Sequence, residues 1–92
     1  MRRANKAKAN STRAGAYLVP WLREALRALG GRGTVTQVCR QIWRTHRRDL
    51  PRLGDAFFTW QYDVRWAAYL LRETGEASFE REGRNTIWHL SR

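Results

Sequence analysis

The sequence predicts a small, mainly α-helical domain with a small β-sheet at its C-terminal end. Two observations favour this fold class. Apolar residues recur at helical spacing in three stretches between Tyr17 and Gly75. After Gly75 the period changes to the alternation that is typical of strands. A chain of 92 residues is expected to form one domain with a modest core.

The first helix is expected from about Tyr17 to Leu29. Its apolar stripe consists of Leu18, Leu22, Ala25, Leu26 and Leu29. Pro20 marks the start, because proline is tolerated in a helix only in the first turn. Gly30 and Gly31 end it, because glycine accepts the left-handed conformation of a helix cap.

The second helix is expected to follow a very short strand at Thr34 and Val35. Thr36 is a candidate N-cap, and the helix would run to about His46. Its inner stripe would consist of Val38, Cys39, Ile42 and Trp43.

The third helix is expected after a loop that contains Pro51 and Gly54. Asp55 is its candidate N-cap, and Gly75 marks its end. The predicted core stripe consists of Trp60, Val64, Ala67 and Leu71. Trp66 is expected to widen this stripe, since a buried Trp is a large share of a small core.

The C-terminal stretch predicts a β-hairpin. Ala77 alternates with Phe79 and Thr86 with Trp88, and a turn around Gly83 separates the two runs. A lone hairpin is barely stable, so the short strand before the second helix is expected to pair with it. The order helix, strand, helix, helix and hairpin is that of a winged helix-turn-helix. In this fold the third helix is the recognition helix and the hairpin is the wing.

A motif in the third helix and the hairpin points to a family. Val64-Arg65-Trp66-Ala67 is followed by Leu70-Leu71, by Gly75 and by a hairpin that ends in Trp88-His89-Leu90. This pattern resembles the winged-helix domain at the N-terminus of Mrr-type restriction endonucleases, over roughly Leu18 to Ser91. The resemblance implies duplex DNA binding by an accessory domain. The nuclease domain of that family is missing, so cleavage does not carry over, and a free-standing regulator or one domain of a larger protein is expected.

The charge of the chain favours a polyanionic partner. The net charge is +10, from 18 Lys and Arg against eight Asp and Glu. Nucleic acid and anionic membranes are the common partners of such a surface. No apolar run approaches the roughly 20 residues that a membrane span needs, so a cytoplasmic, nucleoid-associated protein is expected. Residues 1–15 are expected to form a flexible basic arm that lies along phosphates or in a minor groove, with the winged-helix domain over residues 16–92.

The outer surface of the third helix offers the candidates for contacts with bases. They are Gln61, Tyr62, Arg65, Tyr69 and Arg72. Gln61 suits adenine and Arg65 suits guanine, and they lie one turn apart in the part of a recognition helix that reaches base edges. Asp63 would accept from a cytosine amino group or orient Arg65. A solvated surface or a protein interface is the alternative for this face.

Two groups of arginines are candidates for contacts with phosphates. The first group, on the second helix and the loop after it, consists of Arg40, Arg44, Arg47, Arg48 and Arg52. The second group, at the tip of the wing, consists of Arg81 and Arg84. Glu76, Glu80 and Glu82 dilute the charge of the wing. A solvated surface is the alternative for both groups.

The sequence contains no pattern for catalysis or for a cofactor. It has neither a Ser-His-Asp arrangement nor a phosphate-binding glycine loop. The single cysteine, Cys39, is expected to be buried and inert. His46 and His89 have no further ligands nearby in the sequence, so no metal site is expected.

The sequence therefore predicts a non-enzymatic, duplex DNA-binding protein, either a bacterial transcriptional regulator or the targeting part of a restriction or defence system. One alternative is a winged-helix adaptor that binds a protein through the same face, since Tyr and Arg also anchor protein interfaces. Another is a nucleoid-type binder without sequence preference, which needs only phosphate contacts. A homodimer through Tyr17 and Trp21 is also open.

Overall fold

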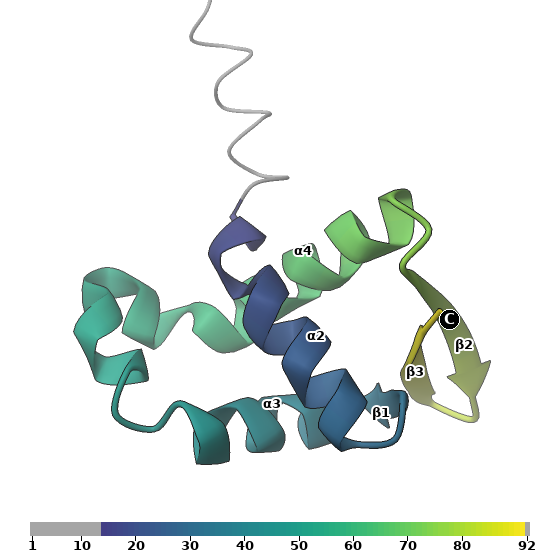
Figure 1. Cartoon of the computed structure of the whole chain (residues 1–92), viewed down its shortest axis with the longest axis horizontal. Helices are drawn as coiled ribbons and strands as arrows, with labels where there is room; N and C mark the ends of the chain where they lie inside the picture. The colour runs from purple at the N-terminus through teal and green to yellow at the C-terminus, as the bar shows by residue number, and fades with distance from the viewer. Residues whose placement is uncertain (1–13, 92) are drawn as a thin grey trace, which may run out of the picture.

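A computed structural model describes residues 14–91 of the chain. Most of the predicted basic arm lies outside these residues. Helices make up most of the described chain, and a small sheet lies at one end of them (Figure 1). The elements are η1 (Ala16–Leu18), α2 (Val19–Ala28), β1 (Arg32–Thr34), α3 (Val35–Thr45), η2 (Leu50–Phe58), α4 (Trp60–Glu73), β2 (Ala77–Glu82) and β3 (Asn85–Leu90). The predicted mainly helical fold with a small sheet is confirmed.

The sheet is antiparallel and has the strand order β1-β3-β2. Gly33 of β1 and Phe79 of β2 both pair with Trp88 of β3. The short strand before α3 therefore pairs with the hairpin, as predicted, and gives the two hairpin strands the support that they lack alone.

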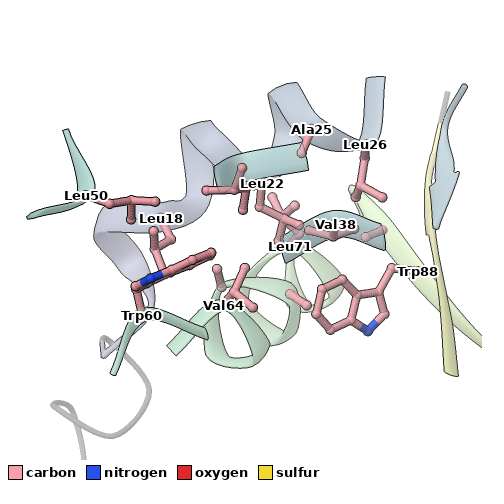
Figure 2. Packing of buried hydrophobic residues seen from close by; sticks show 14 residues of the cluster. Leu18, Leu22, Ala25, Leu26, Val38, Leu50, Trp60, Val64, Leu71 and Trp88 are labelled. Atoms are coloured by element: carbon pink, nitrogen blue, oxygen red, sulfur yellow. The ribbon is translucent and has the colours of Figure 1, made fainter. Parts of the chain in front are cut away.

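The core lies where α2 packs against both α3 and α4. Figure 2 shows leucines of α2, Val38 of α3 and Val64 of α4 pointing toward one another. Trp88 of β3 packs against this core from the side of the sheet. The predicted stripe of α4 is confirmed, because Trp60, Val64, Ala67 and Leu71 are all buried. None of the helices in residues 14–91 combines the length and the apolar character that crossing a bilayer requires.

The start of α3 differs from the prediction. The strand ends at Thr34, and Thr34 rather than Thr36 is the N-cap. The Thr34 hydroxyl accepts from the backbone N–H of Gln37 at 3.1 Å, and the Gln37 side chain accepts from the Thr34 N–H at 2.9 Å. This reciprocal capping box needs Gln three residues after the cap, and Thr34 alone has that spacing.

The segment before α4 is more ordered than the predicted loop. It forms 3-10 turns that break at Gly54, where φ is 70° and ψ is −131°. Leu50 is buried, and Leu53 and Phe57 pack against the core, so apolar contacts hold the segment against the domain. Asp55 lies inside these turns and is not the N-cap of α4, which begins at Trp60.

Two tryptophans of the predicted core are partly exposed. Trp43 is 39% exposed, because Val38 and Ile42 already form the buried stripe of α3. Trp66 lies one residue, about 100° of helix rotation, before buried Ala67. Its ring therefore lies toward the outside of α4, between Tyr62 and Tyr69.

An ion pair joins α2 to the start of β2. Arg23 donates from Nε to Oε2 of Glu76 and from Nη2 to Oε1, both at 3.1 Å. The hydroxyl of Thr74 also donates to Oε1, at 3.2 Å. The hydrogen bonds from Arg23 hold the pKa of the Glu76 carboxyl below its usual value.

This pKa predicts a pH-dependent contribution to stability. Because folding lowers the pKa of Glu76, the ion pair stabilises the fold fully above the ordinary glutamate pKa of about 4.3. The contribution is lost as the pH falls through the lower pKa of the folded state. Glu76→Gln is therefore expected to reduce the free energy of unfolding at neutral pH and to change it little at strongly acidic pH. Urea denaturation at both pH values measures this, with Glu73→Gln as the control, since Glu73 makes no ion pair within residues 14–91. An equal loss at both pH values contradicts the prediction.

Candidate nucleic-acid interface

The outward side of α4 carries every side chain that the sequence predicts there. Gln61, Tyr62, Arg65, Tyr69 and Arg72 are all exposed. They avoid the core because the buried stripe occupies the opposite side of the helix. α4 thus presents an amide, two phenols and two guanidinium groups to solvent.

A groove of about 590 Å³ separates α3 from the start of α4. Val35, Thr36, Cys39, Arg40 and Trp43 of α3 line one side. Phe57 of η2 and Trp60, Gln61 and Arg65 of α4 line the other. The groove therefore combines aromatic and aliphatic surface with one guanidinium on each wall.

Arg65 occupies the junction of α3, α4 and the sheet. Besides the α3/α4 groove, it lines a second hollow of about 220 Å³ together with Val35, Tyr69, Phe79, Thr86 and Trp88. Its Nη1 donates to the backbone carbonyl of Gln61 at 3.1 Å. Burial raises the pKa of the Cys39 thiol above its usual value, and the nearby Arg65 guanidinium offsets part of this effect. A ligand that reaches Arg65 therefore also comes close to Cys39.

Asp63 does not orient Arg65, which is one of the two roles predicted for it. Its Oδ2 accepts from the hydroxyl of Tyr17 at 2.7 Å and from the hydroxyl of Thr59 at 3.1 Å. Burial and the Asp63 carboxylate raise the pKa of the Tyr17 phenol. Asp63 therefore faces the N-terminal turn η1, on the side of α4 away from Arg65, and its charge is directed away from the candidate interface.

Aromatic rings form a continuous row from α4 to the sheet. Successive ring centroids lie 5.5–6.3 Å apart along Tyr62, Trp66, Tyr69, Phe79 and Trp88. The Arg72 guanidinium lies 4.9 Å from the centroid of the Phe79 ring. These contacts pack α4 against the hairpin.

The five arginines predicted on α3 and the following segment do not form one cluster. Arg44, Arg47 and Arg48 line a hollow of about 430 Å³ around the end of α3. Arg40 instead faces the α3/α4 groove, and Arg52 is exposed on η2.

The acidic residues of the hairpin offset the positive charge of its arginines less than the sequence suggests. Glu80 contacts His89, and Glu82 lies 3.9 Å from Arg32. Strand alternation places both acids on the opposite side of β2 from Phe79 and Arg81. Arg81 therefore shares the side of the hairpin that contacts α4, and Arg84 lies in the exposed turn.

His46 makes contacts within the chain, and so do Tyr17 and Trp21, the two residues suggested for a dimer contact. The ring of His46 stacks on Trp21 at 3.9 Å, with Glu24 and Asp49 at its two nitrogens. Tyr17 donates its hydrogen bond to Asp63. Among residues 14–91, no group of three or more His, Cys, Asp or Glu side chains is placed to hold a metal ion.

Two aromatic residues of this face are not among the candidates that the sequence offers. Trp43 and Phe57 both line the groove, and Phe58, the neighbour of Phe57, lies outside it and is 82% exposed. Apolar residues at helical spacing are read as core by default. The run Phe57-Phe58-Thr59-Trp60 is a usable signal, because one short segment cannot bury three large rings on one side.

A scan against protein-family models finds no match, and searches among curated proteins and solved structures find none either. The resemblance to the Mrr-type domain therefore stays a prediction from the residues of α4 and the hairpin.

Proposed function

We propose that this protein binds duplex DNA as a winged helix-turn-helix, with α4 as the recognition helix and the β2–β3 hairpin as the wing. The order of the elements and the pairing of β1 with the hairpin support this fold. In this arrangement α4 enters the major groove, and the groups on α3 and the hairpin lie along the flanking phosphates.

The observation that carries the proposal is the lack of ion pairs at the predicted DNA-contacting arginines within residues 14–91. Nine arginines predicted to contact DNA make no ion pair with any carboxylate of residues 14–91. They are Arg40, Arg44, Arg47, Arg48, Arg52, Arg65, Arg72, Arg81 and Arg84. In contrast, Arg23 pairs with Glu76, and Asp63 is bound by two hydroxyl groups. Unpaired guanidinium groups are available for phosphate oxygens and guanine edges.

The proposal assigns different tasks to different residues. Gln61 and Arg65, near the start of α4, contact base edges and give sequence preference. Arg44, Arg47 and Arg48 contact phosphates and give affinity without preference. Arg81 and Arg84 contact the backbone or the minor groove beside the α4 site.

Two single substitutions test this division. A preferred site is first selected from random duplexes, and binding is then followed by fluorescence anisotropy across a salt series. Arg65→Ala is expected to reduce the preference for that site by about 1–3 kcal/mol. Arg44→Ala is expected to weaken all duplexes alike and to lower the salt slope by about 0.9. Arg27→Ala is the control, since Arg27 is an exposed arginine of α2 that lacks an ion pair within residues 14–91.

Each alternative gives a different result in this experiment. Equal binding of every duplex, unchanged by Arg65→Ala, supports a nucleoid-type binder. No binding of duplex DNA at low salt contradicts the proposal.

One observation favours a protein adaptor as the second candidate function. The ring of Phe58, which is 82% exposed, lies 5.2 Å from that of Phe57, and Phe57 lines the same groove as Trp43, which is 39% exposed. Adjoining exposed apolar side chains of this kind are typical of protein interfaces. Under that function, Phe58→Ala would abolish binding of the partner protein and leave any affinity for DNA unchanged.

A further inference from the structure

The α3/α4 groove has a composition that phosphate binding alone does not explain. Apolar and aromatic residues supply much of its lining, including Trp43, Phe57 and Trp60. Phosphates need cations and N–H donors, whereas flat apolar surface suits the face of a nucleobase. Its volume of about 590 Å³ lies within the range of about 300–1,000 Å³ that is usual for pockets that hold a small molecule.

The polar groups of the groove complement the rest of a nucleotide. Arg40 on α3 and Arg65 on α4 place a guanidinium on each wall, and neither is paired with a carboxylate of residues 14–91. Gln61 presents an amide that both donates and accepts, as the edge of a base requires. Cationic walls with a flat apolar interior match a nucleotide whose base is out of the stack.

Trp43 is the residue of the groove that is best placed to stack on a base. Its neighbours on α3, Val38 and Ile42, are buried, yet its own side chain is 39% exposed beside the groove. No aromatic stacking contact of Trp43 is found within residues 14–91. Its ring is therefore available to stack on an entering base.

We propose that the α3/α4 groove binds a single unpaired nucleobase of a DNA duplex, with Trp43 stacked on the base, Gln61 and Arg65 at its edge, and Arg40 on a flanking phosphate. This inference rests on the proposed function and adds a substrate preference to it. Taking a base out of a fully paired stack has a cost, which is least where the base is already unpaired. The protein therefore binds duplexes with an unpaired nucleotide more tightly than fully paired ones.

The test compares a fully paired duplex with the same duplex carrying one extra, unpaired thymidine at its centre. Fluorescence anisotropy at fixed salt gives both affinities. The wild-type protein is expected to bind the bulged duplex at least about 5-fold more tightly. This factor is the lower end of the gain in affinity expected from stacking one base on an aromatic side chain. Trp43→Ala is expected to remove this preference and to leave the affinity for the paired duplex within about twofold. Phe58→Ala is the control, since this exposed aromatic lies outside the groove, and it should keep the preference.

Cys39 supplies a second readout that needs no substitution. It is the single cysteine of the chain and lines the groove. The bulged duplex is expected to slow alkylation of Cys39 by a maleimide more than the paired duplex does, when each is present at saturation.

The outcomes separate the inference from the proposed function. Equal affinities with equal protection of Cys39 overturn the inference and leave duplex binding intact. A preference that survives Trp43→Ala overturns the assignment to this groove. Failure of both duplexes to bind contradicts the proposed function as well. Protection of Cys39 by polyglutamate but by neither duplex would overturn the inference in favour of an acidic protein as the occupant of the groove.

Discussion

Gly15→Ala is expected to lower the free energy of unfolding by about 3 kcal/mol or more, at the upper end of the effects of overpacking. Gly15 is buried and lies directly against the backbone of α4. A Cβ at this position would overlap the backbone nitrogen of Ala67 and lie 2.5 Å from the carbonyl oxygen of Asp63. It would also lie 2.8 Å from the carbonyl carbon of Trp66.

No small rearrangement relieves this steric overlap. All three atoms belong to the main chain of a helix, so no side-chain rotation makes room for the new methyl group. The N-terminal turn would have to separate from α4, which also breaks the hydrogen bond from Tyr17 to Asp63.

Urea denaturation measures the effect of Gly15→Ala. Ala16→Ser is the control, because Ala16 is the exposed neighbour and substitutions at such positions change stability by about 0.5 kcal/mol or less. A Gly15→Ala variant as stable as this control contradicts the packing of η1 on α4.

Replacing Arg44, Arg47 and Arg48 together by alanine is expected to weaken binding to any duplex on the order of 100-fold at low salt. A hydrogen bond to a charged group contributes about 1.5–3 kcal/mol when well formed, and exposed pairs give less than this. The slope of log K against log salt is expected to fall by about 2.7, because each phosphate that the protein no longer neutralises lowers it by about 0.9. All three side chains are exposed, so the fold should keep its stability.

Salt-dependent anisotropy titrations measure both quantities. The control replaces the same three residues by lysine, which keeps the charge and removes only the planar donor geometry. The lysine variant should therefore keep most of the affinity. An alanine variant with the wild-type slope would show that the end of α3 does not contact phosphates.

Much of the fold follows from local patterns of the sequence. The stripe Trp60, Val64, Ala67 and Leu71 repeats at helical spacing over the length of α4, so its periodicity decides which side is buried. Gly30 and Gly31 adopt positive φ after α2, as the conformational freedom of glycine predicts. Alternation in the C-terminal stretch likewise specifies the hairpin.

The errors arise where two residues compete for one role. Thr34 and Thr36 are both good caps, and only Gln37 at the third position of the helix favours Thr34. Trp43 and Trp66 are predicted to be core residues because they are large and apolar. Smaller neighbours fill the buried positions instead: Ile42 beside Trp43, and Ala67 beside Trp66.

The candidate site is only partly visible in the sequence. The exposure of Gln61 and Arg65 follows from the period of α4. The groove does not follow from it, because Arg40 and Arg65 come from elements far apart in the sequence. Its volume depends on how α3, η2 and α4 pack together, which no local pattern specifies.

Titration of the ¹⁵N-labelled protein with a short duplex at low salt, followed by NMR, tests the central claim most directly. Duplex binding through the proposed face predicts shifts of the backbone amides of Thr36, Arg40, Gln61 and Arg65, and of Arg84 in the hairpin turn. The NMR signals of the amides on the exposed side of α2 should not shift. The absence of shifts, or shifts confined to α2, would contradict the account.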